Sequence, residues 1–280
     1  MKTKQIYTIS DVHGHFKEMK KALDESGFDE NNQDHLLIVC GDIFDRGNEN
    51  VEMFNYLYRL TQENKAIVIR GNHDTMLVDY LEYSNEPWNY MRNGVNTTID
   101  DFLGRTKSFE SWCLVDKGCE QTIGSFAEFI TEARKEINSK YPNLLPWLKS
   151  LPWYYETENY IFAHGAIDTH AVDWKKPHCM LYDKIDWDAL SWDDGSFLGK
   201  RMLNTNKIVV VGHFDTGHLR EKYDLGYGDE HSILECKNIN IASEDGSSYT
   251  VHGHKIFIDG CTVATKEVNV LKIEEEKLLT

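Results

Sequence analysis

Five short apolar runs, each ending at a polar turn, constrain the fold of this chain more than any other feature. They are QIYTIS before Asp11, HLLIVCG before Asp42, AIVIRG before Asn72, NYIFAHG at His164 and KIVVVGH at His213. Continuous apolar runs of this length are typical of central strands buried on both faces, although periodicity alone leaves buried helices open. We therefore expect a sheet-based core whose strands end in polar side chains.

Helical patterns separate the first three runs. The segment FKEMKKALDESGF, residues 16–28, repeats apolar residues at helical spacing and closes at Gly27, a typical helix C-terminal cap. The segment NVEMFNYLYRLTQEN, residues 50–64, has the same spacing before the third run. Strands and helices in alternation indicate a layered α/β protein.

The remaining segments set the expected domain organisation. A chain of 280 residues, 41% hydrophobic and 12% aromatic, can bury one substantial core and is not disordered. Residues 84–150 break the alternation, and we interpret them as a helical insertion over the site within a single domain, 1–280. Residues 226–252 are polar and Gly/Ser-rich, which indicates a hairpin or a mobile loop. We expect strands at 255–261 and 267–273 to close the sheet.

Charge and cysteine content narrow the partners and the compartment. The formal net charge of −16, with no Lys/Arg-rich block, argues against binding a nucleic acid duplex, whereas a small anionic substrate needs local positive charge such as metal ions. The N-terminal apolar run is too short for a secretory signal, and no stretch approaches the roughly 18 apolar residues of a membrane span. The six cysteines form no C-x-x-C pair, so we expect reduced thiols, with Cys40 in the core. The chain is therefore predicted to be soluble and cytoplasmic, with no membrane partner.

Histidine, aspartate and asparagine gather where the five runs end. Asp11 and His13 follow the first run and single histidines end the last two, while the second and third runs lead into GDIFDRG and GNHD. In open α/β sheets, ligand sites form outside the carboxyl ends of the strands. Five strands that bring these residue types to one edge predict a metal site.

The motifs SDVHG, GDIFDRG, GNHD, FAHG and VVGH, in this order, closely resemble calcineurin-like metallophosphoesterases of the PPP serine/threonine phosphatase type. That group includes small bacterial and phage members and the symmetrical diadenosine tetraphosphate hydrolases. The resemblance covers roughly residues 5–265. It implies a four-layer α/β/β/α sandwich with a helical insertion and a dinuclear metal centre between the strand ends.

By this resemblance, two divalent cations share one carboxylate. The first would be bound by Asp11, His13 and Asp42, and the second by Asp42, Asn72, His164 and His213. Two such cations, the two carboxylates and a bridging hydroxide sum to about +1, which can attract a phosphate. Mixed nitrogen and oxygen ligands suit Mn, Fe or Zn, and we expect manganese, with an iron/zinc pair as the alternative.

The resemblance also implies roles for three residues beside the metals. His73 would protonate the leaving alkoxide, oriented by Asp45, because a histidine held by a carboxylate can be kept protonated as a general acid requires. Arg46 would grip the phosphoryl oxygens with its guanidinium fork. The expected reaction is direct in-line attack by the metal-bridging hydroxide, without a phosphoenzyme.

One departure from the pattern leaves the substrate open. Phage-like relatives place a second phosphate-binding arginine just after a tryptophan in the segment before the last metal histidine, where this chain has Asp194. Arg92, Arg201 and Arg220 are candidate replacements. The WNYMRNG stretch, which contains Asn93, resembles one near the substrate cleft of dinucleoside polyphosphate hydrolases, although a simple turn fits it equally.

We therefore keep three functional hypotheses. The first is a phosphoesterase that acts on phosphomonoesters, including phosphoserine or phosphothreonine. The second is a hydrolase of dinucleoside polyphosphates or another nucleotide. The third is a non-catalytic metal-binding protein, against which the His73–Asp45 pair argues, because a binding protein has no use for a proton donor. The sequence indicates no oligomeric state.

Overall fold

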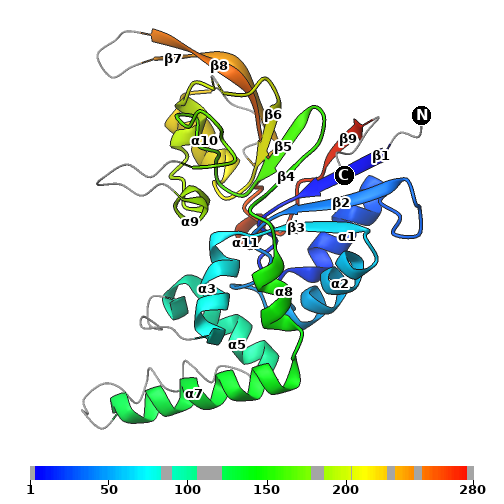
Figure 1. Ribbon diagram of the computed structural model, residues 1–280, viewed down its shortest axis with the longest axis vertical. Helices are drawn as coiled ribbons and strands as arrows, with labels where there is room; N and C mark the ends of the chain where they lie inside the picture. The colour runs from blue at the N-terminus through cyan, green and yellow to red at the C-terminus, as the bar shows by residue number, and fades with distance from the viewer. Residues whose placement is uncertain are drawn as a thin grey trace.

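A computed structural model describes residues 4–82, 90–105, 122–177, 186–202, 204–225, 231–242 and 248–275. Two sheets form its centre (Figure 1). The first has the strand order β3-β2-β1-β9, in which β9 is antiparallel to β1 and the other three strands are parallel. Its strands are β1 (Lys4–Ile9), β2 (His35–Cys40), β3 (Ala66–Ile69) and β9 (Leu271–Glu275).

The second sheet has the order β4-β5-β6-β8-β7. Its three central strands β5, β6 and β8 are parallel, and the two edge strands β4 and β7 are antiparallel to their neighbours. The strands are β4 (Tyr154–Glu156), β5 (Tyr160–Ala163), β6 (Ile208–Val211), β7 (Leu234–Ala242) and β8 (Ser248–Phe257). Two sets of parallel strands therefore deliver their carboxyl ends to the interior of the fold.

Helices cover the outer faces of both sheets. Those that share a hydrophobic core with the first sheet are α1 (Phe16–Ser26), α2 (Asn50–Gln62), α3 (Asn72–Glu82), η1 (Met91–Val95), α5 (Asn96–Leu103), α7 (Thr122–Lys140) and α8 (Leu144–Ser150). Those packed on the second are α9 (Trp187–Ser191), η2 (Ser196–Gly199) and α10 (Thr216–Lys222), while α11 (Thr262–Thr265) follows β8. None of the helices in the described ranges is long and apolar enough to cross a membrane.

Alternation along the strands explains the layering. In β2, Leu37 and Val39 join the core under the helices, whereas Leu36, Ile38 and Cys40 join a second core that also contains Phe162 and Val210 of the other sheet. Successive side chains of a strand point to opposite faces, so each central strand is buried on both. The predicted four-layer α/β/β/α sandwich is confirmed.

Most local predictions agree with the structure. The five apolar runs contain β1, β2, β3, β5 and β6, Gly27 ends α1 in the left-handed conformation, and Cys40 is fully buried. The polar segment at 226–252 contains a hairpin, since β7 pairs with β8. The strand predicted at 267–273 begins only at Leu271.

The helical insertion packs mainly away from the strand ends. Its helix α8 lies against α3, and α7 lies against α3 and α5, farther from the first sheet (Figure 1). Within the described part of this segment, Asn93 is the residue that lines the central cavity. A capping role for residues 84–150, and the single domain 1–280, stay predictions.

Candidate metal centre

The polar residues predicted to converge do converge at the ends of the strands. They surround a cavity of about 150 Å³. Its lining residues are Asp11, His13, Asp42, Arg46, Asn72, His73, Asn93, Trp192, His213, Asp259, Cys261, Thr262 and Val263. His164, the sixth predicted ligand, lies behind this wall and contacts Asp42.

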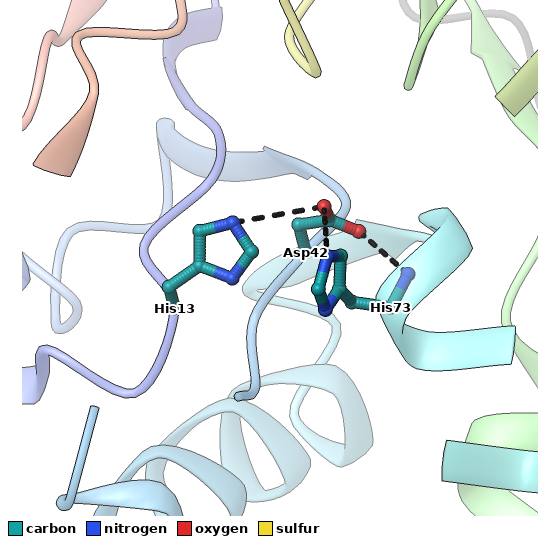
Figure 2. A group of neighbouring side chains, drawn as sticks. All are labelled: His13, Asp42 and His73. Carbon is teal, nitrogen blue, oxygen red and sulfur yellow. Dashed lines mark hydrogen bonds and ion pairs between the residues drawn. The ribbon is translucent and has the colours of Figure 1, made fainter. Parts of the chain in front are cut away.

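Asp42 is the centre of the arrangement. Its Oδ2 lies 3.7 Å from Nε2 of His13 and 4.0 Å from Nε2 of His73, and its Oδ1 accepts a hydrogen bond of 3.0 Å from the backbone N–H of His73. Figure 2 shows the two imidazoles and the carboxylate facing one another. On its other side, Oδ1 lies 3.3 Å from Nε2 of His164. One carboxylate thus faces two groups of nitrogen donors, as a bridging ligand must.

The hydrogen bonds of the imidazoles show which nitrogen is available. Nδ1 of His13 donates to the carbonyl of Phe44 at 2.9 Å, and Nδ1 of His164 donates to the carbonyl of Cys40 at 2.7 Å. In a neutral ring, Nε2 then carries a lone pair. Nε2 of His164 faces two oxygens, Oδ1 of Asp42 at 3.3 Å and Oδ1 of Asn72 at 2.8 Å. Three electron pairs directed at one point require a proton or a cation, so the donor set fits a divalent metal.

Because the two carboxylates are buried, their charged forms need nearby positive charge to be stable. Asp11 is 2% exposed, and burial, reinforced by Asp42 against the opposing effect of His164, raises its pKa to about 7. Burial alone would raise the pKa of Asp42, but the charges of His164 and His73 outweigh it and hold the pKa well below its usual range. Two buried carboxylates whose charges repel each other favour binding of a cation beside them.

The same environment shifts the pKa values of the histidines in opposite directions. Burial alone would lower the pKa of His164, but Asp42 and Asp11 outweigh it and raise the pKa to about 10. Burial lowers the pKa of His13 well below its usual value, and burial together with His164 lowers the pKa of His213 to about 3. His13 and His213 are therefore neutral, which is the state in which imidazole binds metals.

Four of the six predicted ligands have left-handed backbones. The φ angles are 51° at Asp11, 43° at His13, 55° at Asp42 and 66° at His213. Such conformations cost about 1–3 kcal/mol each in residues other than glycine, and they cluster where a site requires them. The turns after β1, β2 and β6 thus hold these side chains at a cost in stability.

Glycines within two of the motifs allow the carboxylates to approach the backbone. A Cβ atom on Gly71 would lie 2.2 Å from Oδ1 of Asp42, and a Cβ on Gly212 would lie 2.3 Å from Oδ2 of Asp11. The backbone N–H of His213, the next residue, donates to that same Asp11 oxygen at 2.8 Å. The glycines in GNHD and VGH are therefore part of the site geometry.

His73 and Asp45 form the predicted pair. Nδ1 of His73 donates to Oδ2 of Asp45 at 2.8 Å, and both side chains are buried. The hydroxyl of Thr98 donates to Oδ1 of Asp45 at 2.5 Å and accepts from the Asp45 backbone N–H at 2.9 Å. Thr98, which the sequence did not single out, fixes the carboxylate that orients His73.

Arg46 bonds to both of the histidines drawn in Figure 2. It donates through Nη1 to Nε2 of His13 at 2.6 Å and through Nη2 to Nε2 of His73 at 2.8 Å. A nitrogen that accepts from Arg46 cannot bind a cation at the same time. Metal binding by His13 therefore requires the guanidinium to move.

Asp74 is a site residue that the sequence analysis did not assign a role. Its carboxylate accepts backbone hydrogen bonds from Asp42 at 3.0 Å, Gly71 at 2.8 Å and Ile43 at 3.2 Å, and it thereby fixes the Asp42 turn to the start of α3. Burial, followed by the charge of Asp42, raises the pKa of Asp74 to about 6. Its position as the last residue of the GNHD motif was the sequence feature that could have indicated this role.

Asp74→Asn is expected to destabilise the protein by about 2–4 kcal/mol, because an amide group presents its own N–H bonds to at least one of three buried donors. Urea unfolding of chelator-treated protein measures the change. Asp79→Asn, on the exposed side of the same helix, is the matched control and is expected to cost less than about 1 kcal/mol. Equal losses for the two variants would contradict the structural role of Asp74.

The candidate replacements for the second arginine do not line the cavity. Arg220 donates to the carbonyls of Ser232 and Ile233, and Arg92 and Arg201 are exposed. Oδ1 of Asp194 accepts from the backbone N–H of Ser196 at 3.0 Å. Among the described residues, Arg46 is the single arginine or lysine in the cavity lining, and Asp194 is absent from it.

Comparison with known proteins supports one family. The family model of the calcineurin-like phosphoesterases matches residues 4–257. Serine/threonine-protein phosphatase 1 of Salmonella typhimurium is 24% identical over 82% of this chain and 85% of its own. A symmetrical bis(5'-nucleosyl)-tetraphosphatase of Buchnera aphidicola is 41% identical over 35% of this chain and 32% of its own. The solved structure of a protein serine/threonine phosphatase from Saccharomyces cerevisiae covers 99% of this chain and 81% of its own, with 13% identity and a TM-score of 0.42.

Proposed function

Because the chain belongs to the calcineurin-like phosphoesterase family, whose members hydrolyse phosphoesters with metal ions, we propose that the candidate metal centre is its active site and that phosphomonoesters are its substrates. The observation that carries this proposal is Asp42, whose two oxygens face separate groups of imidazole nitrogens. A two-metal phosphoesterase requires a bridging ligand of this kind.

Six residues would hold the two cations. Asp11, His13 and Asp42 would bind the first, and Asp42, Asn72, His164 and His213 the second. Two bound divalent cations lower the pKa of water and offset the charge of the phosphate. Manganese, or an iron/zinc pair, suits the mixed imidazole and oxygen ligands.

Three side chains would handle the substrate itself. Arg46 reaches both His13 and His73, so one movement of its guanidinium toward a phosphate would free Nε2 of each ring. Nε2 of His73 could then carry the proton that the leaving oxygen needs, while Asp45 keeps Nδ1 protonated. Arg46 would meanwhile pair with two phosphoryl oxygens.

Two relatives indicate different substrates. The match to the serine/threonine phosphatase extends over most of both chains, which favours a phosphomonoester, including phosphoserine or phosphothreonine. Asn93 lines the cavity, and the shorter match to a bis(5'-nucleosyl)-tetraphosphatase has the higher identity, which favours a dinucleoside polyphosphate as the second candidate. With Arg46 as the only arginine in the described lining, a substrate of lower charge at phosphorus is also accommodated.

Removal of the metals is expected to lower hydrolysis of 4-nitrophenyl phosphate by at least about 10²-fold and to lower the melting temperature, because ions that bind only the folded state stabilise it. Added manganese should restore both. Initial rates on 4-nitrophenyl phosphate, a phosphoserine peptide and diadenosine tetraphosphate then separate the two substrate classes. Metal-loaded protein that is inert on all three, with no further loss after His73→Ala, would instead support a non-catalytic metal-binding protein.

A further inference from the structure

One large aromatic side chain lies exposed at the cavity. In the described ranges, Val172 and Trp192 are the two large hydrophobic residues that are strongly exposed, and Trp192, 46% exposed, lines the cavity while Val172 does not. An indole in water beside a polar site leaves apolar surface that a ligand can cover. Val172 lies outside the cavity lining, so a ligand bound in the cavity would not cover it.

The backbone under Trp192 is fixed. Trp192 directly follows α9 at its C-cap position, where its backbone N–H donates to the carbonyl of Ala189 at 3.2 Å. At the start of the same helix, the Asp186 carboxylate accepts from the N–H of Ala189 at 3.0 Å, and the buried Ser191 donates to the carbonyl of Asp188 at 2.6 Å. These bonds fix the backbone position from which the indole extends.

The indole adjoins a proposed metal ligand. Its ring centre lies 6.4 Å from that of His213, and the two planes meet at 78°. A phosphoryl group held at the metal centre would therefore lie close to the indole, and a group attached to that phosphate would share the cavity with the exposed indole.

We propose that Trp192 stacks on the aromatic part of the leaving group and thereby selects phosphoesters of planar, aromatic groups, either aryl esters or nucleotides. This rests on the proposed function, because it places the phosphate at the candidate metal centre. Stacking of this kind does not depend on the identity of the aromatic group, since any flat ring can cover the face of an indole. Trp192 is a specificity residue in this proposal and takes no part in the chemical step.

Binding of non-hydrolysable phosphonates to metal-loaded protein tests the platform independently of turnover. Trp192→Ala is expected to weaken phenylphosphonate by roughly tenfold in calorimetry and to leave methylphosphonate unchanged, whereas Trp192→Phe should retain most of the phenylphosphonate affinity. Val172→Ala, at the exposed position outside the cavity, is the control and should change neither. AMP, assayed in parallel, reports whether a nucleobase uses the same surface.

Kinetics provide the second readout. Trp192→Ala is expected to raise KM for 4-nitrophenyl phosphate about tenfold with little change in kcat, and to leave both constants unchanged for glycerol 2-phosphate. If Trp192→Ala weakened the binding of phenylphosphonate and methylphosphonate equally, Trp192 would have a general structural role and the proposal would be wrong. Unchanged affinities for both phenylphosphonate and AMP would also overturn it. Wild-type protein that hydrolyses no ester but binds phenylphosphonate through Trp192 would contradict the proposed function alone.

Discussion

Asp42→Asn is expected to lower kcat by more than about 10⁴-fold and to empty at least one metal position. The carboxylate is 2% exposed and faces His13 through one oxygen and His164 through the other. An amide has one oxygen and no charge, so it cannot bridge two cations or offset their repulsion. Elemental analysis of the purified variant counts the metals, and stopped assays on 4-nitrophenyl phosphate give kcat.

The matched control is Asp194→Asn, which makes the same chemical change near the cavity. Asp194 is exposed, accepts from Ser196 and does not line the cavity, so metal content and kcat should remain within about twofold of the wild type. If Asp42→Asn kept two metals per chain and most of its activity, Asp42 would not be the bridging ligand. If Asp194→Asn raised activity severalfold, the carboxylate would repel the substrate after all.

Local sequence patterns predicted the strands, because each strand lies within its own continuous apolar run. Each of β1, β2, β3, β5 and β6 lies in a continuous apolar run that leads into polar residues, and parallel pairing brings those residues to one edge within each sheet. The meeting of the two sheets, which joins the two edges, does not follow from these runs. The motif resemblance then assigned the six candidate ligands, of which the structure brings Asp42, His164 and Asn72 into direct contact. This assignment came from the resemblance, because spacing along the chain does not show which side chains share a cation.

Contacts between distant segments could not be predicted in the same way. Thr98 bonds to Asp45 from a position 53 residues away in the chain, and nothing in the local sequence distinguishes it from Thr97. The positions of α7 and α8 depend on which apolar face meets α3 and α5, and helical periodicity does not identify the partner.

His73→Asn is expected to lower kcat by about 10²–10⁴-fold on an alkyl phosphate and by about tenfold or less on 4-nitrophenyl phosphate. Asp45 holds Nδ1 of the ring at 2.8 Å, and a movement of Arg46 would free Nε2 for the substrate. An asparagine side chain cannot deliver a proton there. An alkoxide leaves poorly without that proton, whereas 4-nitrophenolate is stable enough to leave unprotonated.

Comparison of the two esters isolates proton transfer because they share the phosphoryl group, the cations and Arg46. A lost metal or a misplaced phosphate would slow both esters alike, and elemental analysis of the His73→Asn protein checks the metals directly. Thr98→Val serves as a graded companion, because it removes a hydrogen bond to Asp45 and leaves the His73 ring in place. Its loss should follow the same ester preference at smaller size. Equal losses on the two esters, with metals retained, would make His73 a residue that positions the phosphate and not the proton donor.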